Sequence, residues 1–118
     1  MTESALVDIR DPHGVRPLIL GRLDGSCILT SETCALGIIG ADFVRDIDPG
    51  ELIVISEAGV RWIKPFPKQK HRFCVFEYIY FARPDSVLEG KSVYDARTSI
   101  GAELSRESPV EADVVIPV

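Results

Sequence analysis

The sequence lacks the segments that would attach a chain to a membrane or export it. No apolar run approaches the ~20 residues that a membrane-spanning helix needs. The first residues, MTESALVDIRDPHG, contain no basic region followed by an apolar stretch, which a secretory signal would show. We therefore expect no membrane partner and a cytoplasmic location.

Basic charge is also scarce. The chain carries 13 Lys and Arg against 18 Asp and Glu, for a formal net charge of -5. A protein that binds nucleic acid regardless of sequence needs a basic face to neutralise phosphates, so we expect no nucleic-acid partner. The single basic cluster, KPFPKQKHR at 64–72, lies between apolar segments and is interpreted as a solvated linker.

Residues with reactive or metal-binding side chains are few and scattered. Cys27, Cys34 and Cys74 form an odd set without CxxC spacing, which argues against a disulfide framework and for a reducing compartment. His13 and His71 are far apart in sequence, so a zinc site is not indicated. No glycine-rich loop precedes a helix to hold a phosphate. The residues alone thus complete no active site.

What the sequence does contain is the pattern of one small domain that begins with strands. Asp24-Gly25 is a strong hairpin signal between two of these strands. A short helix is predicted at 31–40, with Gly40 placed to end it. Residues 42–60 return to β character around a turn at 48–50. The strands with predicted bounds are 4–12, 16–23, 26–32, 51–56 and 60–66.

The pattern changes after Pro65 and Pro67. Aromatic residues from Phe73 to Phe81 fall mostly at three- and four-residue steps, which predicts a helix that packs one aromatic face and stops before Pro84. A second helix is predicted at 92–108. The apolar segment 112–118 predicts a buried strand. Because a complete domain rarely starts or stops on such a strand, we expect the chain to be part of a longer one.

Four motifs, in this order, resemble a known family. They are RDPHGVRPLILG (10–21), SETCAL (31–36), DFVRDIDPGE (42–51) and CVFEYIYFARPDS (74–86), and they resemble amidophosphoribosyltransferase, also called glutamine phosphoribosylpyrophosphate amidotransferase. The resemblance covers essentially the whole chain. The first three motifs have counterparts in the glutaminase half of glucosamine-6-phosphate synthase, whereas EYIYFARPDS is specific to the phosphoribosyl enzyme.

The resemblance implies an α+β fold shared between two domains. Residues 1–66 would be the C-terminal strands of an N-terminal-nucleophile glutaminase with α/β/β/α layers. Residues 67–111 would be a linker with connecting helices, and 112–118 the first strand of a type I phosphoribosyltransferase α/β domain. Such an enzyme moves the amide nitrogen of glutamine to phosphoribosyl pyrophosphate and forms 5-phosphoribosylamine, the first step of de novo purine biosynthesis. Mg²⁺ and a homo-oligomeric assembly are implied as well.

The resemblance carries over no catalytic or cofactor-binding residue, so we expect this chain alone to be inactive. The family's nucleophile is an N-terminal cysteine, whereas Met1 is followed here by Thr2. In cluster-bearing members a cysteine just ahead of EYIYFARPDS is a [4Fe-4S] ligand, and such a cluster takes four thiolates. Cys74 is therefore either a cluster ligand or a plain buried cysteine. Gly37 stands where an acidic residue is expected after CAL.

Several other residues are interpreted as structural. Arg10 and Arg16 bracket a turn, and either could pair with Glu32. Arg83 and Asp85 are expected to fix the turn in ARPDS, and we hypothesise an interdomain role for them. Cys27 and Cys34 are interpreted as packing residues, and the carboxylates of RDIDPGE (45–51) as solvated.

Two alternative functions stay open. One is a different class II glutamine amidotransferase, such as a sugar-phosphate aminating enzyme, although that group lacks YIYFARPDS. The other is a non-catalytic, stand-alone interaction module, whose exposed strand edges would need a partner.

Overall fold

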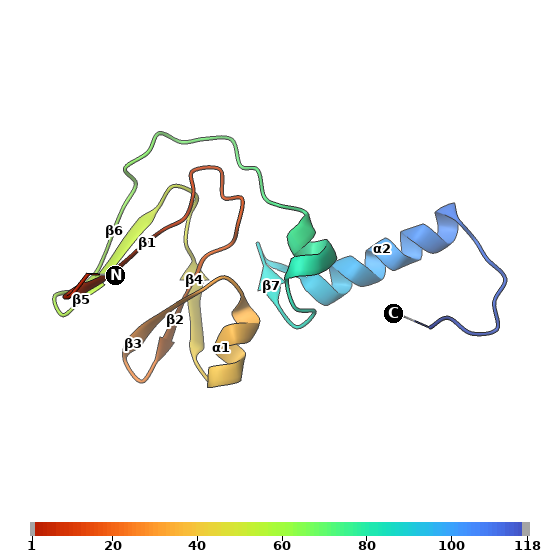
Figure 1. Ribbon diagram of the computed structural model, residues 1–118, viewed down its shortest axis with the longest axis horizontal. Helices are drawn as coiled ribbons and strands as arrows, with labels where there is room; N and C mark the ends of the chain where they lie inside the picture. Colours follow the sequence, from red (N-terminus) through yellow and green to blue (C-terminus); the bar gives the residue numbers. More distant parts are fainter. Residues whose placement is uncertain (1, 117–118) are drawn as a thin grey trace.

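The computed structural model describes residues 2–116, and in them six strands form two antiparallel sheets of three (Figure 1). The first sheet has the order β1-β5-β6, with strands Ala5–Ile9, Leu52–Ser56 and Gly59–Ile63. The second has the order β3-β2-β4, with strands Ser26–Thr30, Ile19–Leu23 and Asp42–Asp46. Each predicted strand between residues 4 and 66 is confirmed, with ends shifted by a few residues.

Local turn chemistry sets the ends of these elements. Asp24 and Gly25 join β2 to β3 with φ of 48° and 83°, the left-handed pair that a tight hairpin requires. Helix α1, Thr33–Ile39, ends at Gly40 with φ 70°, as predicted. The hairpin turn therefore follows from the dipeptide Asp24-Gly25, and the end of the helix follows from Gly40.

The sheets lie in layers, and neighbouring residues of β2 show how. Side chains alternate across a strand, so Ile19 and Leu20 point to opposite faces. Leu20 packs with Ile47 and Ile53 in a core between the sheets. Ile19 packs with Leu36 of α1 and with residues from the C-terminal part in a second core. This sheet–sheet–helix order agrees with the mixed α and β fold that the resemblance implied.

The C-terminal part of the chain packs on the second core through short elements. A π-helix, Glu77–Phe81, is followed by a hairpin of two-residue strands, β7 (Val87–Leu88) and β8 (Lys91–Ser92). Helix α2, Val93–Glu107, begins directly after the hairpin, and Ser92 caps it by accepting from Asp95 N–H at 3.2 Å. Helix α2 confirms the predicted helix at 92–108.

Helix α2 projects away from the sheets (Figure 1). The Cα radius of gyration is therefore 18.0 Å, against about 13 Å for a compact domain of 100 residues. Two apolar residues that share one face of α2, Ile100 and Leu104, are 50% and 61% exposed. The described part of α2 thus packs on the molecule mainly through its first turns.

The prediction of an aromatic helix over 73–81 is wrong in its extent and its burial. The helical part is a single π-turn, closed by Ala82 N–H donating to Glu77 C=O, and the 3.6-residue period does not apply to it. Tyr80 is 78% exposed, whereas Glu77 is buried. Phe73 and Tyr78 alone among these aromatic side chains pack against the core.

The predicted strand at 112–118 is also not found over its described part. Residues 112–116 are irregular, and residues 117–118 lie outside the described residues. A strand needs a neighbouring strand to pair its backbone N–H and C=O groups, and the described residues place none beside this segment. Its assignment to a second domain stays a prediction, as do the bounds of the other two parts.

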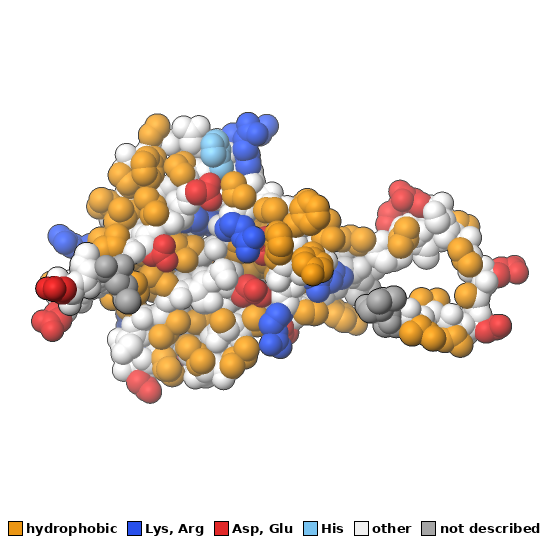
Figure 2. Space-filling model, viewed as in Figure 1, with side chains coloured by type: hydrophobic (Ala, Val, Ile, Leu, Met, Phe, Trp, Pro, Cys, Tyr) orange, Lys and Arg blue, Asp and Glu red, His pale blue; other side chains and the backbone are white. Residues whose placement is uncertain are grey.

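Large apolar side chains lie exposed over several elements, and Figure 2 shows hydrophobic groups across the sheets and the middle of the molecule. Examples are Phe43 of β4, Trp62 of β6 and Tyr94 of α2. Among residues 2–116, no helix has the length and apolar character to span a bilayer.

Candidate functional site

The sheets and the C-terminal elements meet at the loop that follows β1, residues 10–16. The carboxylate of Asp11 shapes this loop by accepting from His13 N–H at 2.9 Å and from Val15 N–H at 2.8 Å. Gly14 has φ 62°, and a Cβ there would lie 2.7 Å from Pro49 and 2.9 Å from His71. Glycine is therefore required both by the backbone and by the close approach of two other segments.

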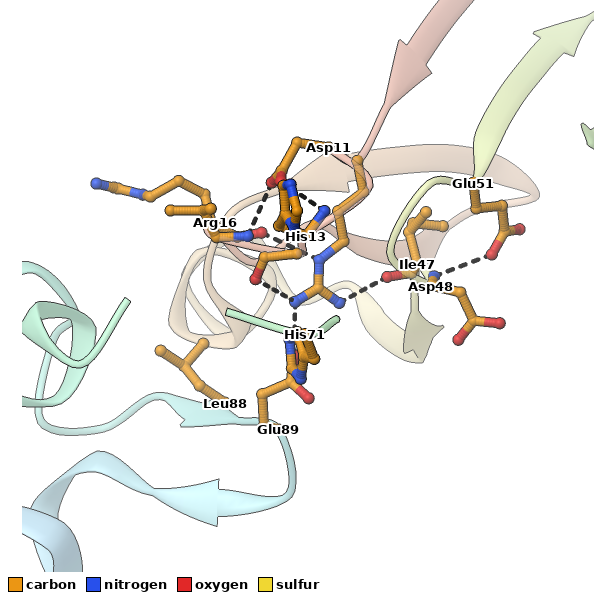
Figure 3. A network of polar contacts seen from close by, with 12 residues as sticks. Asp11, His13, Arg16, Ile47, Asp48, Glu51, His71, Leu88 and Glu89 are labelled. Carbon is orange, nitrogen blue, oxygen red and sulfur yellow. Dashed lines mark hydrogen bonds and ion pairs between the residues drawn. The ribbon is translucent and has the colours of Figure 1, made fainter. Parts of the chain in front are cut away.

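Arg10 lies at the centre of this junction, and Figure 3 shows its partners Arg16, Ile47 and Glu89. Its side chain is 3% exposed and donates to the carbonyls of Arg16 at 3.0 Å, Ile47 at 2.7 Å and Gly14 at 3.4 Å. It also donates from Nη2 to Glu89 Oε1 at 2.6 Å. A buried guanidinium is tolerated only when its charge is paired and its donors are bonded, and both conditions hold here.

Glu89 reaches Arg10 from the turn of the β7–β8 hairpin. Its φ is 49°, a left-handed value that a residue with a long side chain rarely adopts. Nε2 of His71 lies 3.9 Å from the same carboxylate oxygen. Sequence reasoning did not identify Glu89, because the Glu-Gly pair is not a typical hairpin signal and the residue is 79 positions from its partner.

The segment before the aromatic run lies along the same loop. Arg72 N–H donates to His13 C=O at 2.8 Å, and Cys74 N–H donates to Val15 C=O at 3.0 Å. Cys74 is half-buried. Among residues 2–116 no three His, Cys, Asp or Glu side chains gather as metal ligands, so these residues alone do not fit a [4Fe-4S] cluster.

Arg16 pairs with Glu77 of the π-helix. Its Nε lies 2.6 Å from Glu77 Oε1, although the contact is not aligned as a hydrogen bond. The guanidinium carbon also lies 4.6 Å from the centroid of the Phe81 ring, a cation–π arrangement. Burial, offset only in part by Arg16, raises the pKa of the Glu77 carboxyl above its ordinary value.

Glu32 contacts the ARPDS segment instead of either arginine. Its Oε2 accepts from Arg83 N–H at 2.8 Å and from Ser86 Oγ–H at 3.1 Å. The prediction that Arg10 or Arg16 pairs with Glu32 is therefore wrong, because Glu89 and Glu77 lie closer to them in the folded chain. Arg83 and Asp85 do pair, with Nε 3.1 Å from Oδ1, as expected of residues that fix this turn.

The cysteines within the fold are held as packing residues, as predicted. Cys34 is buried at the start of α1, and Cys27 packs against the core between the sheets. Burial raises the pKa of the Cys34 thiol, and Glu32 beside it adds to the rise. The thiol is therefore kept protonated, which disfavours nucleophilic chemistry.

One of the carboxylates interpreted as solvated is buried. Glu51 is 3% exposed and accepts from Arg45 Nη1 at 3.0 Å and from Asp48 N–H at 2.9 Å. Asp48 at the same turn is exposed and pairs with Lys64 at 2.6 Å. A hollow of about 420 Å³ nearby is lined by both acidic and basic groups, including Lys64, His71 and Glu89.

Taken together, the charged groups of this region bind one another and backbone carbonyls. They join the loop 10–16 to the turn 46–50, to the β7–β8 hairpin and to the π-helix. Glu32 joins the start of α1 to the ARPDS segment. The candidate site is therefore a junction that holds the sheet layers and the C-terminal elements in one arrangement.

The sequence is similar to known proteins over its whole length. The whole chain is 51% identical over 123 residues to amidophosphoribosyltransferase of Rhizobium etli and 57% identical over 121 residues to that of Mycobacterium bovis. The enzyme of Archaeoglobus fulgidus is 44% identical over 118 residues. The chain is homologous to amidophosphoribosyltransferase. No family model matches the sequence.

Two solved structures share this fold. Glutamine phosphoribosylpyrophosphate amidotransferase from B. subtilis, complexed with ADP and GMP, superposes with a TM-score of 0.88 at 40% identity over 96% of this chain. A structure described as the allosteric regulatory enzyme of purine biosynthesis gives a TM-score of 0.87 at 41% identity. This chain spans about a quarter of the relatives' length, with 25% of the Rhizobium enzyme and 22% of the Mycobacterium enzyme covered.

Proposed function

We propose that this chain is a segment of an amidophosphoribosyltransferase, in which glutamine supplies ammonia that displaces pyrophosphate from phosphoribosyl pyrophosphate. The observation that carries the proposal is the match over the whole chain, at 51% and 57% identity, to enzymes of that name. A different class II amidotransferase is disfavoured because EYIYFARPDS is present.

The role proposed for this segment is to connect the two activities. In this proposal, the two sheets belong to the glutaminase domain that the resemblance implied, and the C-terminal elements lead toward the transferase domain. The ion pairs at the junction, each with one buried partner, support this role, since they would hold the two parts in a fixed orientation. We further propose that the full-length enzyme is a cytoplasmic homo-oligomer that uses Mg²⁺.

A cluster ligand role for Cys74 stays a separate proposal. Its partners would have to be three thiolates from outside this chain. Iron and acid-labile sulfide in the purified full-length enzyme, lost on Cys74→Ser but not on Cys27→Ser, would support it. Equal iron content in the two variants would reject it.

The first experiment is to sequence the DNA on both sides of this reading frame and to express the longest open frame. The proposal expects a cysteine exposed after initiator methionine upstream and an acidic phosphoribosyl loop downstream. The purified product should release pyrophosphate from phosphoribosyl pyrophosphate only when glutamine or ammonia is present with Mg²⁺. In-frame stop codons on both sides would overturn the proposal and favour a stand-alone module.

A further inference from the structure

Arg10 joins three segments that are distant in the sequence. Its guanidinium binds the carbonyls of Gly14 and Arg16 within its own loop, the carbonyl of Ile47 beyond β4, and the carboxylate of Glu89 in the β7–β8 turn. Figure 3 shows Arg16, Ile47 and Glu89 of this network. Glu89 is the anionic group at hydrogen-bond distance from it. Asp46 lies near enough that Arg10 and Glu89 shift its pKa in opposite directions, while burial raises it most.

The backbone of Glu89 indicates that its side chain matters at this position. A left-handed φ strains a non-glycine residue, and Glu89 adopts one at 49°. Glycine or asparagine would take the same turn with less strain. Neither would bring a carboxylate to Arg10, so the charge is what glutamate adds to this turn.

The hairpin that carries Glu89 is attached on its other side to helix α2 and to the aromatic segment. Leu88 is fully buried, and its carbonyl accepts from Tyr78 Oη–H at 2.6 Å. Val93 N–H at the start of α2 donates to Ser86 C=O at 3.0 Å. Arg97 of α2 donates to the carbonyls of Tyr78 at 2.8 Å and Ala82 at 2.7 Å. A displacement of Glu89 would therefore move α2 and the π-helix together.

We infer that Arg10 and Glu89 form a latch between the sheet layers and the unit made of the hairpin, α2 and the π-helix. Resting on the proposed function, the two are positioning residues for coupling, since they set how the glutaminase layers face the elements that lead to the transferase. With the latch broken, glutamine hydrolysis continues while less of the released ammonia reaches the second reaction.

The test compares Glu89→Gln and Glu89→Gly in the full-length enzyme, with Glu103→Gln as the matched control. Glu103 is exposed on α2 and pairs with Arg106. Glu89→Gly removes the carboxylate and also relieves the backbone strain of the turn. A lower coupling ratio in this variant therefore reports loss of the latch and not a strained or unfolded turn. The readout is the ratio of phosphoribosylamine formed to glutamate released, measured beside synthesis from added ammonia.

We expect both Glu89 variants to lower the coupling ratio on the order of tenfold, because small displacements between reacting groups cost rates of that scale. Synthesis from added ammonia should change less than twofold, and Glu103→Gln should behave as wild type. An unchanged ratio in folded variants would overturn the latch. A parallel fall of the ratio and of ammonia-dependent synthesis would overturn it also, since the pair would then be merely structural.

Amide hydrogen exchange distinguishes failure of the latch from failure of the proposed function. In the full-length protein, Glu89→Gln should speed exchange at the Val93 and Ala82 N–H groups relative to Glu103→Gln, whatever reaction the protein catalyses. Equal protection in the two variants would reject the latch. Failure of the proposed function would show separately, as a wild-type enzyme that forms no phosphoribosylamine from glutamine.

Discussion

The carboxylate of Glu32 accepts a hydrogen bond from the backbone N–H of Arg83 at 2.8 Å, across 51 residues of sequence. The same oxygen accepts from Ser86 Oγ at 3.1 Å. The next residue, Thr33, accepts from Val87 N–H at 2.8 Å. The start of α1 thereby holds the ARPDS segment through its backbone, which leaves the Arg83 side chain free to pair with Asp85 and face solvent.

Replacing Glu32 with alanine should detach this segment. Removal of this carboxylate leaves the hydroxyl of the buried Ser86 without its acceptor, which costs about 1–3 kcal/mol. The free energy of unfolding should fall by about that amount. Urea unfolding followed by circular dichroism measures it. Glu57→Ala, in the exposed turn between β5 and β6, should leave the midpoint in place; an equal loss in both variants would contradict the assignment.

Two glycines near α1 should respond to alanine with opposite signs. A Cβ on Gly21 would lie 2.4 Å from Leu36 Cδ2, so Gly21→Ala should destabilise by about 1–3 kcal/mol through overpacking. A Cβ on Gly37 meets nothing within 4 Å, and Gly37→Ala within the helix should stabilise by about 0.5–1 kcal/mol. Thermal unfolding of the two variants side by side checks the signs, and a shared sign would refute the packing described.

Glu51 should make the fold sensitive to acid. Burial tends to raise its pKa, but the hydrogen bonds from Arg45 and Asp48 N–H outweigh burial, and the pKa is lowered below its ordinary value of 4.5. A carboxylate with a lowered folded pKa stabilises above pH 4.5, and this contribution is lost as pH falls through the folded value.

Glu51→Gln should therefore lose about 2 kcal/mol at pH 7, less than for a fully buried pair because Arg45 is partly exposed. The difference from wild type should shrink as pH falls below 4.5. Denaturant unfolding at pH 7, 5, 4 and 3 measures it. A constant difference across that range would show that the charge of Glu51 does not stabilise the fold.

Glu77 should have the opposite dependence on pH. Its pKa is raised by burial, with Arg16 opposing the rise. A carboxyl with a raised folded pKa stabilises fully below its unfolded pKa, and this contribution is lost as pH rises through the folded value. The stability of Glu77→Gln relative to wild type should thus increase between pH 4 and pH 7. A relative decrease over the same range would mean that Arg16 governs the ionisation of Glu77.

Arg83 tests the hypothesis of an interdomain role raised by the ARPDS motif. Because its side chain contacts Asp85 and is 59% exposed, Arg83→Ala should leave the turn folded through the Glu32 contact. In the full-length enzyme we expect glutamine hydrolysis to continue while phosphoribosylamine formed per glutamate released declines. Arg106→Ala, at the far end of α2, is the control, and coupling equal to wild type in both variants would end the hypothesis.

The local elements of this protein were predictable because short-range rules determine them. Asp24-Gly25 favours a tight turn, Gly40 permits the left-handed end of α1, and Ser92 caps α2, each by sterics or hydrogen bonds within a few residues. The motif EYIYFARPDS was enough to indicate the family. The prediction of a regular helix over 73–81 failed because it assumed a 3.6-residue period, which does not apply to the π-helix.

The partners of the charged residues were decided by the tertiary structure. Arg10 and Glu89 are 79 residues apart, and Glu32 and Arg83 are 51 apart. No periodicity in the sequence relates such positions, because their meeting depends on how two sheets and a hairpin pack around separate cores. Burial follows from the same packing: Glu51 and Glu77 look like surface carboxylates in the sequence, and only the layers above them exclude water and bring each an arginine.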